Sequence, residues 1–355
     1  MVFVRTFTYS LVTGATLLFL AAKIGSAYGH VRYVLSDDEI AKVNGERATP
    51  TTLLQGDMLA VVMLAGFLFV VAFQFLGLFL SKKSLIKTLE EGLRPLESYV
   101  PLILRLMVGG FLVLSGLTDK LFSPQASISF SGSISIVSIL QMVAGTLLLF
   151  GVLTKIGAAI LAALVALSFA QLGVHGLDQF VLLGVAVILF FEGGLKHSLD
   201  SLTITKVPAV RKIGTYLDAY RVYSMPMLRI TLGISLVWLG LTEKLLAPEL
   251  TEAAVIKYNV PYFPELRLFV FFFGFFEVLL GAHYLLGIFN RLISLMYLGL
   301  LGSAFFLFGE GVNHLHLFAV TLAFLIRGAG PYRMHIALSG AEVTVPKNIM
   351  TKSTG

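Results

Sequence analysis

Residues 104–124 read LRLMVGGFLVLSGLTDKLFSP, and residues 228–248 read LRITLGISLVWLGLTEKLLAP. The two stretches align without a gap at an offset of 124 residues, and polar and small residues match as well as apolar ones. The matched pairs include Arg105 with Arg229, Gly109 with Gly233, Asp119 with Glu243, Lys120 with Lys244, and Pro124 with Pro248. Matched charges and prolines do not follow from hydrophobicity alone, so these stretches predict an internal repeat.

A second pair of stretches extends the repeat. QMVAGTLLLFGVLTK at 141–155 aligns with EVLLGAHYLLGIFNR at 277–291, at an offset of 136 residues. This alignment pairs Gln141 with Glu277 and Gly145 with Gly281. The increase in offset predicts a longer outer loop in the second copy, after Pro248.

Composition points to lipid as the solvent. Of 355 residues, 57% are hydrophobic and 13% are charged, and the mean hydropathy is +0.90. Soluble globular chains have about 45–50% apolar and about 25% charged residues. We therefore expect an all-α, polytopic integral membrane protein embedded in the lipid bilayer, with no nucleic-acid partner. The absence of cysteine excludes disulfides, cysteinyl iron–sulfur clusters and thiolate zinc sites, and we expect no metal site.

Ten stretches are long and apolar enough to span a bilayer, since a span needs about 20 apolar residues. They lie at 7–27, 53–80, 99–122, 134–153, 156–174, 177–195, 225–246, 267–288, 291–309 and 312–329. These spans divide the chain into an N-terminal two-helix membrane module (1–98), a first four-helix unit (99–200), a basic connector (201–222), a second four-helix unit (223–335) and a tail (336–355). Each unit has an even number of helices, so the two units should be parallel, with a pseudo-two-fold axis along the membrane normal.

Lysine and arginine are distributed unevenly between the loops, which indicates orientation. With the N-terminus inside, sixteen basic residues fall in inner loops and ends and five in outer loops; the outer five are Arg32, Lys42, Arg47, Lys257 and Arg267. We therefore expect a multi-pass protein of the cell membrane with a cytoplasmic N-terminus and C-terminus. A signal peptide cleaved near Gly29 is the alternative for the first span. Because Lys23 interrupts its apolar core, we favour a retained anchor helix.

Glu277 is the candidate catalytic residue. It lies near the middle of an apolar span, within FFFGFFEVLLG, and an ionisable residue at that depth is costly and indicates function by default. Burial favours a neutral carboxyl unless a cation lies near it. A hydrogen-bonded structural glutamate is the alternative. The first unit has Gln141 at the matching position, which cannot carry a proton.

Repeated charges supply candidate substrate-binding residues, namely Asp119, Lys120, Glu243, Lys244, Arg105 and Arg229. Adjacent residues on a helix do not face each other, so each acid and the lysine beside it should have different partners. For Arg105 and Arg229, near the inner helix ends, one interpretation is snorkelling to lipid phosphates. The other is a buried pair with an acid or with a quinone carbonyl.

Histidines gather toward the outer side and are candidate cofactor-binding residues. They include His314 and His316, which lie about 200° apart on a helix, and the deeper His283. A bis-histidine haem b between His283 and either of the other two is an open alternative. We expect these histidines to be hydrogen-bonded packing residues instead.

The repeated motifs resemble those of the DoxX/DoxD family of four-helix membrane bundles. The shared pattern is an arginine at the start of a helix, G-L-x-[DE]-K-L-x-x-P at its end, and a following helix with [EQ]-x-x-x-G and a [TN]-[KR] boundary. GGLKHSLD at 193–200 also looks like the family's C-terminal signature, whereas GAGP at 328–331 departs from it. The N-terminal module lies outside the resemblance.

The resemblance implies a membrane subunit of a quinone-linked oxidoreductase, of the thiosulfate:quinone oxidoreductase kind to which DoxD subunits belong. Quinone would bind near Glu277, and an anionic sulfur substrate outside would meet Lys120 or Lys244. Other membrane or extracytoplasmic subunits are the expected partners. A non-catalytic scaffold or anchor subunit of a larger membrane complex is one alternative, and a transporter is another, since parallel repeats also build transporters.

Overall fold

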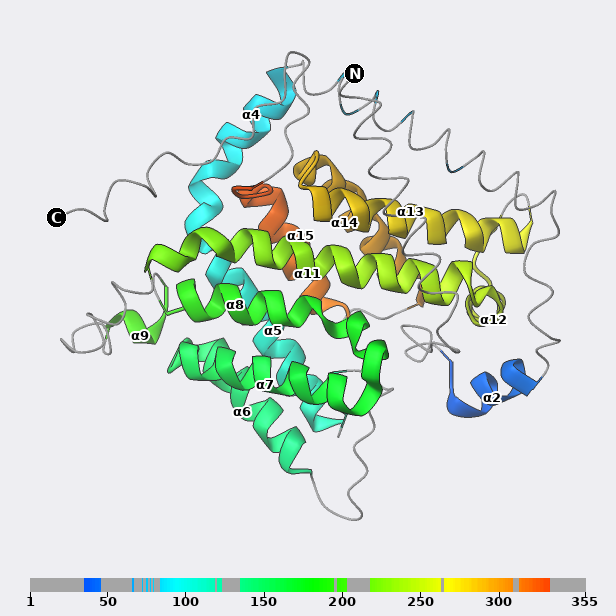
Figure 1. Cartoon of the computed structure of the whole chain (residues 1–355), viewed down its shortest axis with the longest axis horizontal. Helices are drawn as coiled ribbons and strands as arrows, with labels where there is room; N and C mark the ends of the chain where they lie inside the picture. The colour runs from blue at the N-terminus through cyan, green and yellow to red at the C-terminus, as the bar shows by residue number, and fades with distance from the viewer. Residues whose placement is uncertain are drawn as a thin grey trace.

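The computed structural model describes residues 35–45, 84–118, 120–122, 135–194, 197–202, 218–262, 265–308 and 313–332, with five single positions between 66 and 79. The spans expected at 7–27 and 53–80 and the tail at 336–355 lie outside the described residues, apart from those single positions. Within the described part, the chain is a bundle of apolar helices (Figure 1).

Each of the eight spans expected between residues 99 and 329 contains one apolar helix. The first unit contains α5 (Val100–Leu117), α6 (Ile136–Phe150), α7 (Thr154–Leu172) and α8 (Val181–Glu192). The second unit contains α11 (Ser224–Leu239), α13 (Leu266–Leu286), α14 (Asn290–Phe308) and α15 (Leu315–Arg327). Short helices flank these segments: α2 (Asp37–Gly45), α4 (Ser84–Leu93), α9 (Leu199–Leu202), α12 (Pro248–Lys257), and the turns η3 (Arg94–Tyr99), η4 (Gly173–Gln179) and η6 (Ala219–Tyr223).

Five helical segments in the described part are long and apolar enough to cross a membrane. They are Thr88–Leu117, Thr154–Gln179, Ala219–Leu245, Leu266–Leu286 and Asn290–Leu307. The apolar helices α6, α8 and α15 are shorter. The chain is therefore a helical membrane protein.

The contacts between helices follow one pattern in the two units. The first and second helices of a unit pack together, as α5 does on α6 and α11 on α13, and so do the third and fourth, as α7 does on α8 and α14 on α15. The fourth helix of each unit also packs on the first helix of the other, so α8 lies along α11 and α15 along α5 (Figure 1). The hydrophobic core is therefore continuous across both units.

Glycines allow the first and second helices of each unit to approach closely. A Cβ on Gly109 would lie 2.8 Å from the carbonyl oxygen of Gly145, and a Cβ on Gly145 would lie 2.7 Å from that of Gly109. Gly233 and Gly281 show the same reciprocal distances of 2.8 and 2.7 Å. Small residues at both positions let the helix backbones touch, as is common where membrane helices pack without a hydrophobic driving force between them.

The sequence predicts a longer loop after Pro248 in the second unit. The structure shows that this segment contains a helix, α12. Pro248 begins it, a position where the missing amide proton costs nothing. The helix α12 packs on α13 and on α2, and its Leu250 and Ala254 form an apolar cluster with Leu35 and Ile40 of the segment around α2. The segment 35–45 therefore packs against α12 of the second unit.

Candidate functional site

The helix α11 continues as a π-helix, η7 (Gly240–Leu245), which carries Glu243 and Lys244. The amide of Leu246 donates to the carbonyl oxygen of Leu241 at 2.8 Å, which is the i to i+5 pattern. Single π-helical turns are rare and are found frequently at functional sites. The segment that carries the repeated acid and lysine is therefore the irregular part of α11.

Lys244 is bound to Glu277. The Nζ atom of Lys244 lies 2.8 Å from the Oε2 atom of Glu277, and the two side chains are only 17% and 12% exposed. The helices approach closely here, since a Cβ on Gly240 would lie 2.8 Å from the carbonyl oxygen of Gly274 and 3.0 Å from the Cβ of Glu277. The ion pair therefore joins η7 to the middle of α13.

The ion pair faces a half-open cavity of about 180 Å³ in the second unit. Most of its lining is apolar, from α12, α13, α14 and α15, and includes Val255, Phe269, Phe273, Leu300, Leu301 and Leu317. The polar lining consists of Glu243, Lys244, Thr251, Glu277, Tyr297, Ser303 and His314. A mostly apolar cavity with a few convergent polar groups is the usual form of a small-molecule site.

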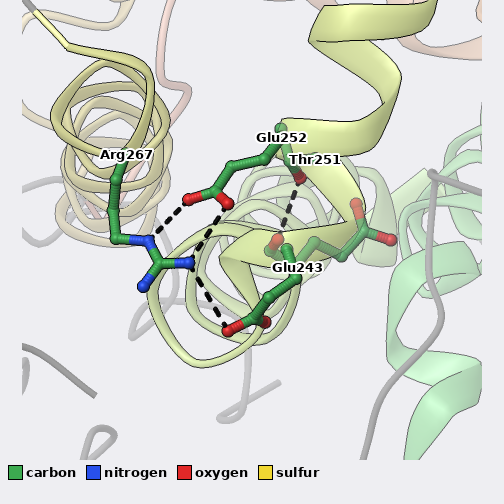
Figure 2. Close-up of polar contacts among 5 residues, drawn as sticks. Glu243, Thr251, Glu252 and Arg267 are labelled. Atoms are coloured by element: carbon green, nitrogen blue, oxygen red, sulfur yellow. Dashed lines mark hydrogen bonds and ion pairs between the residues drawn. The ribbon is translucent and has the colours of Figure 1, made fainter. Parts of the chain in front are cut away.

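Hydrogen bonds and ion pairs hold α12, which lines part of this cavity, against η7 and α13 (Figure 2). The hydroxyl of Thr251 donates to the carbonyl oxygen of Glu243 at 2.9 Å. Arg267 of α13 pairs with Glu252, with 2.7 Å between Nε and Oε1, and its Nη2 lies 3.9 Å from Glu249. These contacts connect α12 both to η7 and to α13.

A further ion pair joins α12 to the N-terminal module. Lys257 lies 2.8 Å from Glu39 of α2. The hydrogen bond from Lys257, together with backbone and side-chain hydrogen bonds from Ser36, lowers the pKa of Glu39 to about 2. The carboxyl is therefore ionised at neutral pH and keeps α2 against α12.

The matching position of the first unit is organised differently. The amide nitrogen of Gln141 donates to the Ser115 hydroxyl at 2.7 Å and to the carbonyl oxygens of Lys120 at 3.2 Å and Leu112 at 3.4 Å, and its oxygen accepts from the Phe122 amide at 3.3 Å. Gln141 therefore stabilises the turn after α5 through hydrogen bonds to its backbone. Asp119 lies outside the described residues.

The two repeated arginines lie among backbone carbonyls, and neither lines the cavity. Arg105 donates to the carbonyl oxygen of His197, and Arg229 donates to those of Ala329 at 3.3 Å and Tyr332 at 2.9 Å. Both arginines are buried, so they do not snorkel to lipid phosphates as one sequence interpretation had it. Each holds the segment after the fourth helix of its unit onto the first helix.

The GGLKHSLD stretch at 193–200 also makes a structural contact. The carboxylate of Asp200 accepts from the amides of Leu153 at 2.7 Å and Thr154 at 2.8 Å. It therefore caps the N-terminus of α7, where backbone amides lack partners inside the helix.

The three candidate histidines do not line one site. Only His314 lines the cavity. His283 lies in the last turn of α13, where its Nδ1 donates to the carbonyl oxygen of Leu279 at 2.8 Å. His316 packs its ring on Phe111 of the first unit, at 4.4 Å between centroids. Among the described residues there is no group of three or more potential ligands that could hold a metal ion.

Sequence reasoning missed Tyr297 and the α12 residues that line the cavity. The signal for Tyr297 was present, because the 136-residue offset pairs it with Leu161 of the first unit. Where one unit has a tyrosine and the other has a leucine at the equivalent position, the packing that the units share does not require the hydroxyl. The contact of Thr251 with Glu243 had no such signal, because the second unit has twelve more residues between Pro248 and the aligned part of α13 than the first unit has after Pro124.

Comparison of the chain with protein-family models, with curated proteins and with solved structures finds no match.

Proposed function

We propose that this chain is a membrane subunit of a quinone-linked oxidoreductase, and that a quinone substrate binds beside the Lys244–Glu277 pair in the second unit. The observation that carries the proposal is this ion pair, largely shielded from solvent and facing a mostly apolar cavity. Isolated buried charges are costly, and a lysine and a glutamate placed together at such a site are expected to serve function.

The size and lining of the cavity suit a ring with polar substituents. An engineered apolar cavity of roughly 150 Å³ in another protein holds benzene, and this cavity measures about 180 Å³. Phe269 and Phe273 supply aromatic surface, while Lys244 and Tyr297 supply hydrogen-bond donors. A quinone head group presents an aromatic-sized ring with two carbonyl oxygens, which matches both kinds of lining.

Full reduction of a quinone to a quinol takes up two electrons and two protons. The ammonium group of Lys244 can donate a hydrogen bond to a carbonyl oxygen in the cavity, and Glu277 can bind and release a proton. The electrons would come from a partner subunit that oxidises a reduced sulfur anion of the thiosulfate class, as the DoxD resemblance implies. Because Glu277 already neutralises Lys244, we do not assign Lys244 to the sulfur anion, and Lys120 remains the candidate for that role.

We further propose that the chain has ten spans, with both ends cytoplasmic, and that its units are two parallel DoxX/DoxD-like bundles. The support is the repeated helix contacts, the matching glycine pairs Gly109–Gly145 and Gly233–Gly281, and the equivalent use of Arg105 and Arg229. External labelling of single cysteines introduced into residues 28–52 and into the tail tests the orientation. Labelling of the tail from outside would refute it.

The catalytic proposal is tested by quinone reduction in the purified complex with Glu277→Gln. This substitution gives the second unit the residue that the first unit has at Gln141, so we expect folding to be kept and turnover to fall by at least tenfold. Glu90→Gln is the matched control, since it changes a half-exposed acid that lies 3.5 Å from Arg291 and does not line the cavity. Full turnover in Glu277→Gln would favour the scaffold alternative. A loss of extracted protein would mark Glu277 as structural.

A further inference from the structure

Tyr297 of α14 is a buried residue that lines the cavity, and its hydroxyl makes no hydrogen bond within the part of the chain that the structure describes but is not itself fully enclosed. The residue is 2% exposed and lines the cavity together with Glu277. Its neighbour Tyr284, with 6.5 Å between the ring centroids, is equally buried, but the Tyr284 hydroxyl lies 2.9 Å from the Ser294 hydroxyl. Of these two buried tyrosines, only Tyr284 has its hydroxyl hydrogen-bonded to a described protein group.

A buried tyrosine hydroxyl usually has a partner, because leaving it unpaired costs free energy. The fold does not need this hydroxyl. The helices α7 and α14 match along their full lengths at the 136-residue offset, and Leu161 occupies the position of Tyr297 in the first unit, fully buried in the core. The hydroxyl of Tyr297 is thus an addition to the shared packing, located at the cavity that carries the ion pair.

We propose that the Tyr297 hydroxyl donates a hydrogen bond to an oxygen of the ligand in this cavity, and so makes the cavity selective for rings that carry a carbonyl. This assignment deepens the proposed function and rests on it for the ligand class. A ring without an oxygen would leave the hydroxyl unpaired. A quinone would pair both donors, the Lys244 ammonium at one carbonyl and Tyr297 at the other.

The test compares two probes of one shape, duroquinone and durene, which share the ring and its methyl groups and differ in the carbonyl oxygens. Their binding to the full chain in mild detergent is measured by titration calorimetry, for the natural protein and for Tyr297→Phe. We expect Tyr297→Phe to weaken duroquinone binding about three- to tenfold, the range of one net hydrogen bond, and to change durene binding by less than about twofold.

An equal loss for both probes would overturn the inference, because it would mean that Tyr297 acts only through packing. An unchanged duroquinone affinity would overturn it as well, and so would a natural protein that binds neither probe. Tyr297→Leu, which introduces the residue of the first unit, should weaken both probes, because it also removes ring surface from the cavity.

Failure of the proposed function gives a different pattern. If Tyr297→Phe discriminates between the probes while Glu277→Gln leaves quinone reduction unchanged, the cavity binds quinones but does not reduce them at Glu277. The assignment of Tyr297 then stands and the oxidoreductase proposal fails. If Glu277→Gln abolishes quinone reduction and Tyr297→Phe binds duroquinone normally, the oxidoreductase proposal stands and the assignment of Tyr297 fails.

Discussion

The two units place an amide and a carboxyl at one position, and the surrounding backbone differs accordingly. In the first unit, Gln141 donates to the carbonyl oxygen of Lys120 and accepts from the Phe122 amide, so it holds the turn after α5. In the second unit, Glu277 binds the lysine side chain. An ionised carboxylate has no proton to donate to a carbonyl oxygen, so it cannot make the contacts that the amide makes.

In the second unit, the matching backbone amide is hydrogen-bonded within its own helix instead. Leu246, which matches Phe122, donates its amide to Leu241 within the π-helix rather than to a side chain. The exchange of Gln for Glu is thus accompanied by a change in helix type, and it frees the Glu277 side chain to face a cavity. One polar position serves packing in one unit and a candidate site in the other.

The largest difference between the units should appear when the lysine is removed. Lys244→Met leaves Glu277 buried without its partner, and breaking a buried pair in this way costs about 3–5 kcal/mol. Lys120→Met, in the unit that has Gln141, should cost much less. The measurement is the thermal unfolding midpoint in mild detergent. Adding Glu277→Gln to Lys244→Met should recover most of the loss. Equal effects of the two lysine substitutions would break the comparison.

Substitution of the two repeated arginines should destabilise both units to a similar extent. Arg105→Met and Arg229→Met each remove hydrogen bonds from a charged group to backbone carbonyls, which are worth about 1.5–3 kcal/mol. We expect similar destabilisation in both and unchanged quinone reduction per folded molecule. A selective loss of turnover in Arg229→Met, with normal stability, would show that the arginine contacts substrate after all.

The glycine contacts should also behave alike. Gly145→Ala and Gly281→Ala each place a Cβ 2.7 Å from a backbone oxygen of the facing helix, and overpacking of this kind costs about 1–3 kcal/mol. Unfolding midpoints of the two variants should therefore fall together. If only Gly281→Ala were destabilised, the close approach of α5 and α6 would not contribute to the stability of the first unit.

The smallest effect concerns the contact between α2 and α12 of the second unit. The pKa of Glu39 is lowered from 4.5 to about 2, so its contribution is complete above pH 4.5 and is lost as the pH falls from 4.5 to about 2. Hydrogen exchange of residues 37–45, corrected for intrinsic rates, should accelerate over that range. In Glu39→Gln the exchange should be faster already at neutral pH and should show no further rise. A pH response that survives in Glu39→Gln would assign it to another group.

Several features of this protein could be predicted from the sequence because they depend on local composition and spacing. Apolar runs place the eight helices of the two units, and the matched positions identify Glu277 and Lys244 as residues of interest. Other features depend on contacts between distant segments. The burial of Arg105 and Arg229 on backbone carbonyls is one example, since a carbonyl can accept from any donor and leaves no trace in residue identity.

Composition and apolar runs are enough to identify the chain as a helical membrane protein, because a long apolar helix satisfies its own backbone hydrogen bonds in lipid. The contacts of the charged residues, in contrast, are known from the fold alone. It paired Lys244 with Glu277, joined α12 to η7 through Thr251, and placed Tyr297 in the lining of a cavity. These outcomes depend on the angles at which helices cross and on where their backbones touch, and residues far apart in the sequence set both.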